Sequence, residues 1–278
     1  MRHGGVVLSS DAVRVRVEPE RGMTLVSLIA GGRELLWTRP DAASDGDAGE
    51  LGELGEAGKA SAERLEAILE GGWFEMSPNA GLPDRPGRPS AYVHGEAVRR
   101  SWRVRSQSDV HVEADLRLSS EPIALRRRVE VRGRTVLVVS ELQNRGSGSR
   151  PVSPGEHPCF RRDVFGGGSL TVHGDALDTH DAPRAIPLRA DGTSGNAAVR
   201  LADPRVVLRA RDGLEVVMHV DLDAHPHLGV WWNYSPGGGS GIAAWDTIAI
   251  EPLTRFRDEV LLPPGATYSS RTVIEVAP

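Results

Sequence analysis

Apolar and polar residues alternate along most of the chain in short runs, which Gly, Pro, Asn and Asp residues separate. Strict alternation is the pattern of a strand with one buried face. It predicts strands at 12–17, 24–29, 34–37, 110–118, 125–131, 136–142, 206–208, 214–220, 248–250 and 268–276. Gly31-Gly32 and Arg132-Gly133-Arg134 are the expected hairpin turns. Many short strands with this spacing predict an all-β fold built as a large antiparallel sandwich.

Residues 41–70 break this pattern, because they carry many acids and several glycines but almost no β-branched or aromatic residues. The first part, 41–58, is expected to form a mobile acidic surface insertion. The second part, 61–70, has a capping-box-like start and is rich in helix formers, which predicts a short helix. The chain shows no fixed-period repeat and no clear linker, so a single domain over 1–278 is expected.

Composition narrows the class of protein. The 278 residues are 39% hydrophobic and 26% charged, which is enough apolar material for a sizeable core. The net charge of -5 argues against a nucleic-acid partner, and the run Arg126-Arg127-Arg128 is interpreted as a solvated strand face. A single cysteine, Cys159, rules out an intramolecular disulfide. The first residues lack the apolar stretch of a signal peptide, and no run approaches the ~18 apolar residues of a membrane span, so a cytoplasmic location is expected.

Three short segments combine polar residues with features that aim a side chain. His94 precedes Gly95, where the backbone can turn sharply and leave the imidazole projecting. His157 precedes a proline, which holds it extended and restrains its direction. Glu251 ends an apolar strand, where partial desolvation raises the pKa of a carboxyl group and makes the carboxylate a stronger base. The three segments together could supply an acid/base site.

Each signal also has a structural alternative. Satisfied structural histidines outnumber catalytic ones, so a lone His-Gly pair predicts little. Glu251 could instead form a salt bridge with Arg255 or Arg257. Three further histidines lie close together in sequence, namely His219, His225 and His227. No cysteine and no pair of carboxylates lies near them at ligand spacing, so no metal site is predicted.

Taken together, these segments resemble the aldose 1-epimerase family, the galactose mutarotase-like enzymes. Residues 155–160, Gly-Glu-His-Pro-Cys-Phe, follow Asn144-Arg-Gly and resemble the family's Gly-x-His-Pro-x-Phe signature, the most specific match. Residues 22–36 are similar to its N-terminal hairpin and residues 78–81 to its first binding loop. His94-Gly95 with Trp102 resembles the second loop, and 250–252 with 262–265 resemble the closing Glu-Pro and Pro-Gly turn. The resemblance covers essentially the full length.

This resemblance implies a β-supersandwich that interconverts the α and β anomers of a monosaccharide. It implies that Glu251 is the general base for the C1 hydroxyl, that His157 protonates the ring oxygen, and that His94 stabilises charge nearby. A reaction that only moves protons needs one acid and one base, so no cofactor and no metal are expected. The expected partner is a small sugar, a hexose or a derivative, with no membrane or nucleic acid, and the chain is expected to be a monomer or homodimer.

The expected sugar-binding residues are Asn79, Arg99, Trp231, Trp232 and Asp175. Pyranose faces pack on flat aromatic rings, and of two successive tryptophans on a strand one is expected to face inward. Asp178 is an alternative to Asp175 for the aspartate that binds sugar hydroxyls. Val98 stands about where many family members have an arginine, so the resemblance leaves open whether the sugar is free or phosphorylated.

Two other classes of function remain open from the sequence. A non-catalytic carbohydrate-binding or sensing protein could use the same fold, although such a protein could lose the three acid/base residues that this chain keeps. A lyase or hydrolase could also share it. A hydrolase needs a second carboxylate across the scissile bond, for which the segments offer Glu75, Glu96 and Glu156.

Overall fold

The computed structural model of the protein describes residues 5–39, 71–81, 94–176, 185–187, 194–234, 246–254 and 259–277. The predicted insertion at 41–58 and the predicted helix at 61–70 lie outside these residues. Within them the chain is almost entirely antiparallel β-structure, with two short helical segments, η1 (Ala97–Arg99) and α2 (Arg162–Phe165). The predicted all-β class is therefore confirmed. Among the described residues, no helix combines the length and apolar character needed to cross a membrane.

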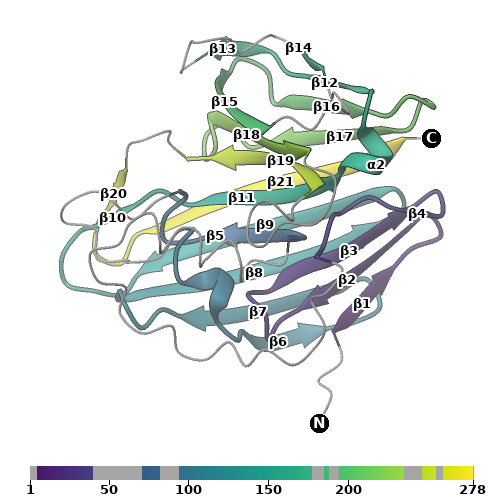
Figure 1. Cartoon of the computed structure of the whole chain (residues 1–278). Coiled ribbons are helices and arrows are strands. Elements are labelled where there is room, and N and C mark those ends of the chain that lie inside the picture. Colours follow the sequence, from purple (N-terminus) through teal and green to yellow (C-terminus); the bar gives the residue numbers. More distant parts are fainter. Residues whose placement is uncertain are drawn as a thin grey trace.

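Two large sheets contain most of the strands (Figure 1). The first sheet has the order β1 (Val6–Ser9), β2 (Val13–Glu18), β3 (Thr24–Ala30), β5 (Trp73–Met76), β11 (Gly155–Arg161), β19 (Asp246–Leu253), β18 (His227–Tyr234), β15 (Ser194–Leu201) and β13 (Gly174–Ala176), with β4 (Arg33–Glu34) paired to β3. Its centre therefore joins β5, from the first third of the chain, to β19, near the end.

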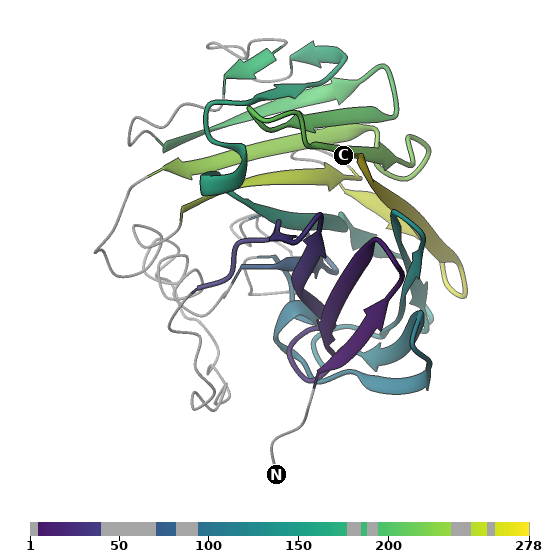
Figure 2. The same ribbon diagram turned by 90° about the vertical axis from the view of Figure 1, so that its right-hand side faces the viewer.

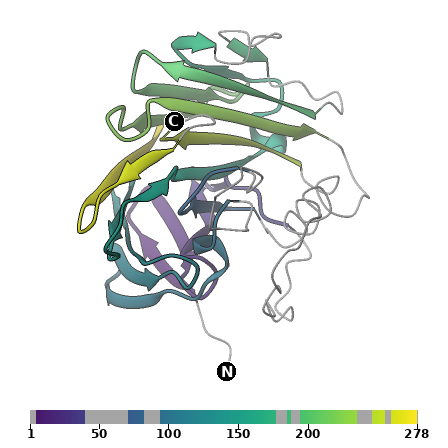
Figure 3. The same cartoon turned by 90° about the vertical axis from the view of Figure 1, so that its left-hand side faces the viewer.

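The second sheet has the order β14 (Ala185–Pro187), β12 (Ser169–Thr171), β16 (Arg205–Arg209), β17 (Glu215–Val220), β21 (Thr267–Ala277), β9 (Thr135–Asn144), β8 (Ile123–Arg132), β7 (His111–Arg117) and β6 (Arg103–Gln107). A separate two-stranded ribbon pairs β10 (Arg150–Val152) with β20 (Val260–Leu262). Seen from either side, the purple strands β1–β3 of the first sheet lie against the blue strands β6–β8 of the second sheet, and the green strands form the upper half (Figures 2 and 3).

The main core lies between the two sheets. Alternation along each strand sends every second side chain into it, such as Ile248 and Ile250 from β19 and Val129 from β8. The intervening residues of the central strands of the first sheet point to its other face. There Phe74, Met76, Cys159, Ala249 and Leu253 form a second apolar cluster together with Trp37, which follows β4, and Val98 of η1. Both faces of β5, β11 and β19 are consequently covered.

Two sequence interpretations need correction. Of the strand predicted at 34–37, only Glu34 belongs to β4 (Arg33–Glu34). Leu36 forms an isolated bridge with Phe160, and Trp37 joins the second cluster. The arginine run is not a uniformly solvated face. Arg126 and Arg128 are exposed, but the period of two turns the middle residue, Arg127, inward, where its side chain is fully buried.

Candidate active site

His157 and Glu251 face each other across adjacent strands. β11 and β19 pair through Gly155 with Leu253 and Cys159 with Ala249, so His157 lies level with Glu251 between these two pairs. The Nε2 atom of His157 is 3.6 Å from Oε1 of Glu251. Both residues share the sheet face of the second apolar cluster, because His157 is two residues from Cys159 and Glu251 is two from Ala249. The acid and base predicted from separate motifs are thus neighbours.

His94 reaches the same place from the loop before η1. It has a positive φ of 59°, and Gly95 after it has a φ of 77°. The His94 and His157 ring centroids are 5.1 Å apart in an edge-on arrangement. The Gly81 backbone N–H donates to Nδ1 of His94 over 3.3 Å, so a neutral His94 ring carries its proton on Nε2. This leaves Nε2–H as the donor that His94 can offer.

The floor under the two imidazoles is apolar. The Phe74 ring stacks on His157 with a centroid separation of 4.5 Å and an interplanar angle of 13°. The Sγ atom of Cys159 is 3.2 Å from Nδ1 of His157, and burial raises the pKa of this thiol well above its usual range, so it stays protonated. Stacking against Phe74 and the sulfur contact at Nδ1 hold the His157 ring in position.

This apolar setting shifts the acid/base properties of all three residues. Burial raises the pKa of Glu251 to about 7. Burial, helped by the nearby positive Arg99, lowers the pKa of His94 to about 4. Burial, and then repulsion from His94, hold the pKa of His157 well below its usual range. Burial therefore favours a shared proton on the Glu251 carboxyl group over one on the His157 ring.

The expected sugar-binding residues fall into two groups. Asn79, Arg99 and Trp231 lie around the three acid/base residues. Asn79 is buried and donates from Nδ2 to the Gly81 carbonyl over 3.4 Å, next to the backbone contact of His94. Arg99 is close enough to His94 to lower its pKa, and Trp231 packs against the second apolar cluster, beside Ala249 of β19.

The other two expected binding residues lie elsewhere. Trp232 packs against the main core, on the opposite sheet face to Glu251, because successive strand residues alternate. Trp232 therefore does not lie where it could contact a sugar beside Glu251. The prediction that one of the two tryptophans faces inward is confirmed. Asp175 lies on β13, which β15 and β18 separate from β19. Asp178, the alternative, is outside the described residues.

The three carboxylates considered for hydrolysis do not face Glu251. Glu75 and Glu156 point between the sheets, and Glu96 is bound by the backbone N–H groups and hydroxyls of Ser119 and Ser120. The second carboxylate of a hydrolase is thus missing from the positions that the sequence offered.

Glu75 and Glu156 instead belong to a buried ion cluster that sequence reasoning missed. The Arg127 guanidinium donates from Nη1 and Nη2 to both oxygens of Glu156, over 2.7 and 2.8 Å, and from Nη1 to Glu75 over 3.3 Å. Ser140 and the Trp73 indole N–H complete it. Burial raises the pKa of Glu75 against the attraction of Arg127. The only sequence signal was the alternation along β8, which places Arg127 inward.

Metal binding has no support from the described part of the chain. Within it, no group of three or more His, Cys, Asp or Glu side chains is arranged to hold a metal ion. Of the three histidines noted in the sequence, His219 is exposed and His225 is buried with a pKa lowered to about 3 by that burial.

Several solved structures of other proteins share the fold of this chain. No family model and no curated protein matches the sequence. A putative aldose 1-epimerase from Escherichia coli K12 superposes with a TM-score of 0.72 at 16% identity, covering 98% of both chains. The chain has the galactose mutarotase-like fold. A galactose mutarotase related enzyme from Lactobacillus acidophilus gives a TM-score of 0.72 at 14% identity, over 99% of this chain and 97% of that one.

A galactose mutarotase-like protein from Lactobacillus casei gives a TM-score of 0.69 at 17% identity, over 99% of this chain and all of the other. The resemblance inferred from short motifs is therefore confirmed for the galactose mutarotase-like fold. At these low sequence identities the similarity supports a shared fold only, so an activity has to be argued from the site itself.

Proposed function

We propose that the protein is an aldose 1-epimerase, which interconverts the α and β anomers of a monosaccharide. The observation that carries the proposal is the facing pair of Glu251 and His157, 3.6 Å apart on an apolar floor with His94 beside them. Anomer exchange needs one group to take a proton and another to give one, at two oxygens that share the same carbon. A facing carboxyl and imidazole supply both groups.

In the proposed reaction Glu251 removes the proton from the C1 hydroxyl while His157 protonates the ring oxygen, so the ring opens to the aldehyde. Rotation about the C1–C2 bond and closure on the opposite face give the other anomer, with both protons returned. The neutral His94 donates from Nε2 to the oxygen that carries developing charge. Each turnover returns the protein to its starting protonation state, so no outside reagent is consumed.

The low polarity of the site disfavours the charged forms of Glu251 and His157 that these roles require. The reaction needs ionised Glu251 and protonated His157, whereas burial favours neutral forms of both groups. The two arrangements contain the same single proton and interconvert by transfer across the pair. A sugar between the two groups would offer hydroxyl oxygens that stabilise the charged arrangement, which the apolar floor does not.

Sugar binding is proposed to involve Trp231, Asn79 and Arg99. Trp231 offers a half-buried flat ring at the edge of the second apolar cluster, suited to the C–H face of a pyranose. Asn79 and Arg99 carry hydrogen-bond donors beside His94. The proposed ligand is a hexose or a hexose derivative.

Saturation-transfer NMR on glucose, galactose and hexose 6-phosphates tests the activity, because it measures anomer exchange directly. The wild-type protein is expected to accelerate exchange of at least one of these sugars. Glu251→Gln and His157→Ala should each lower the rate by about 10²- to 10⁴-fold, the usual contribution of proton transfer. Circular dichroism should show the same spectrum for all three proteins.

The matched control is Glu156→Gln. Glu156 precedes His157 on β11, and its carboxylate points to the core side of that strand. Its folded fraction should retain anomer exchange within a few fold. If the wild type accelerates no sugar, or if Glu251→Gln keeps near-normal activity, the proposal is wrong. Saturable sugar binding without exchange would favour a carbohydrate-binding protein.

A further inference from the structure

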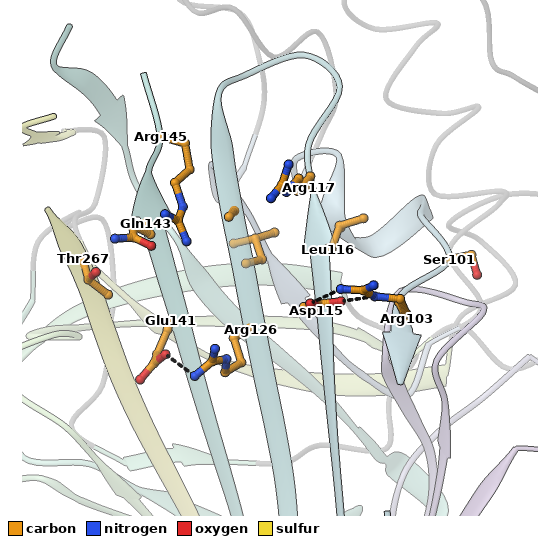
Figure 4. A pocket seen from close by; sticks show the side chains of 12 residues that line it. Ser101, Arg103, Asp115, Leu116, Arg117, Arg126, Glu141, Gln143, Arg145 and Thr267 are labelled. Atoms are coloured by element: carbon orange, nitrogen blue, oxygen red, sulfur yellow. Dashed lines mark hydrogen bonds and ion pairs between the residues drawn. The ribbon is translucent and has the colours of Figure 1, made fainter. Parts of the chain in front are cut away.

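A recess lies on the outer face of the second sheet, on the far side of the sandwich from the candidate active site. Arg126 points outward from β8 and Arg127 inward; Arg127 contacts Glu156, and His157 points outward from the first sheet. Both sheets therefore separate the recess from His157. The recess is a depression of about 600 Å³ (Figure 4). Its side chains come from β6, β7, β8, β9 and β21, with Ser101 before β6 and Arg145 after β9.

The strand register arranges these side chains in rows across the sheet. One row contains Arg103, Asp115, Arg126 and Glu141 on successive strands. This row is neutral overall and its charges are paired. Arg103 donates to both oxygens of Asp115 over 3.0 and 2.9 Å, and Arg126 lies 3.9 Å from Glu141. The dashed lines in Figure 4 mark these two pairs. This row has little capacity left for a charged ligand.

The next row differs. It contains Arg117, Ala124, Gln143 and Thr267 on successive strands, and Arg145 follows directly after β9. These five residues are called the arginine depression. Arg117 and Arg145 are exposed, and neither lies within ion-pairing distance of an acid in the described part of the chain. Figure 4 shows them on either side of β8. The net charge of the arginine depression is +2, on a chain whose total is -5.

Ala124 gives the arginine depression its hollow. Arg126 and Arg128, the other outward residues nearby on β8, are long and exposed, whereas Ala124 ends at its methyl group. Arg117 and Gln143 flank it, so their backbones are about 10 Å apart, twice the spacing between strands. A tetrahedral anion fits such a gap, and its oxygens can accept from guanidinium groups on two sides at once. A planar carboxylate presents two oxygens and satisfies one guanidinium fork.

We infer that the arginine depression is a binding site for a phosphate dianion, either inorganic phosphate or the phosphate group of a small phosphomonoester. Arg117 and Arg145 bind the charge from opposite sides, while the amide of Gln143 and the hydroxyl of Thr267 supply further donors. The site is separate from the proposed acid/base chemistry and does not depend on it.

Isothermal titration calorimetry with inorganic phosphate tests the site, with chloride used to keep the ionic strength constant because screening weakens exposed charges. Wild-type protein should show saturable binding. The double variant Arg117→Gln/Arg145→Gln should weaken binding by about tenfold or more, since charge-assisted hydrogen bonds are lost. Glucose 6-phosphate forms a second arm: equal affinity indicates recognition of the phosphate alone, and tighter binding that the same double variant abolishes indicates a phosphomonoester.

The matched control is Arg128→Gln/Arg271→Gln, which removes the same charge from the same face outside the arginine depression. It should change the phosphate affinity by less than about twofold, since only screened long-range attraction is altered. A third variant, Ala124→Val, fills the hollow without changing charge and should also weaken binding. The inference is wrong if phosphate does not bind saturably, or if the control double variant loses as much affinity as the double variant in the depression.

Discussion

At the scale of single residues, one shared proton governs the candidate site. Glu251 has a pKa raised to about 7, and His157 has a pKa well below its usual range, so between these two values the pair holds one proton. Below that window both groups are protonated and no base remains. Above about pH 7 the pair loses its last proton, so no acid remains. In the proposed mechanism the active form therefore exists only inside this window.

The pH dependence of kcat/KM for anomer exchange should follow this proton count. We expect a plateau on the acidic side of neutrality and a decline above about pH 7 that approaches tenfold per pH unit. Saturation-transfer NMR across a pH series, corrected for the spontaneous rate in buffer, measures it. A profile that keeps rising through pH 8 and 9 would contradict the assignment, because it would require an acid with a much higher pKa.

At the scale of elements, the loop that carries His94 depends on Gly95, and Gly31 in the β3–β4 turn is a glycine with the opposite surroundings. Gly95 has a φ of 77°, and a Cβ there would overlap the carbonyl oxygen of Ser77. Gly31 has a φ of 58° in the β3–β4 turn, where a Cβ would meet nothing within 4 Å. The backbone penalty of a side chain is similar at both, but only Gly95 is also crowded.

Gly95→Ala should therefore displace His94 and lower kcat/KM for anomer exchange by about 10-fold or more, since small displacements of catalytic groups are costly. Gly31→Ala should cost about 1 kcal/mol of folding free energy and leave activity unchanged. Kinetics together with urea denaturation of both variants separate the two effects. Equal activities in the two variants would show that the His94 loop tolerates the displacement.

The elements also show what a sequence can reveal. Alternation predicted β2, β7, β8, β9 and β21 closely, because each has one face toward the core and one toward solvent. β5 and β11 are buried on both faces, so no alternation marks them. His157 and Glu251 were predicted from local sequence features and from the motif resemblance. That they lie only 3.6 Å apart follows from the strand register, which the sequence does not show. Arg127 was misinterpreted because a run of three arginines is usually solvated.

At the scale of the whole molecule, Arg127 ties the two sheets together. It comes from β8 of the second sheet and binds Glu156 and Glu75 from the first. Its bond to Glu156 lies directly behind His157 on β11. Loss of the guanidinium would leave buried carboxylates without a counter-charge, which is far more costly than loss of an exposed charge.

Arg127→Met should lower the free energy of unfolding by about 3–5 kcal/mol. Arg126→Met, the neighbouring exposed position, should change it by less than about 0.5 kcal/mol. Urea denaturation of both variants, followed by circular dichroism, gives the comparison. If the two variants are equally stable, the buried ion cluster contributes no stability and its role between the sheets must be reconsidered.

The strand order has a consequence for how the chain is made. β11 pairs with β5 on one side and with β19 on the other, so a ribosome must reach residue 253 before β11 gains its second neighbour. Until then a strand of buried residues, His157 among them, presents an open edge, which is a template for association with other chains. The central sheet therefore stays incomplete until β19 has been made, and during that time its open edge is exposed to aggregation.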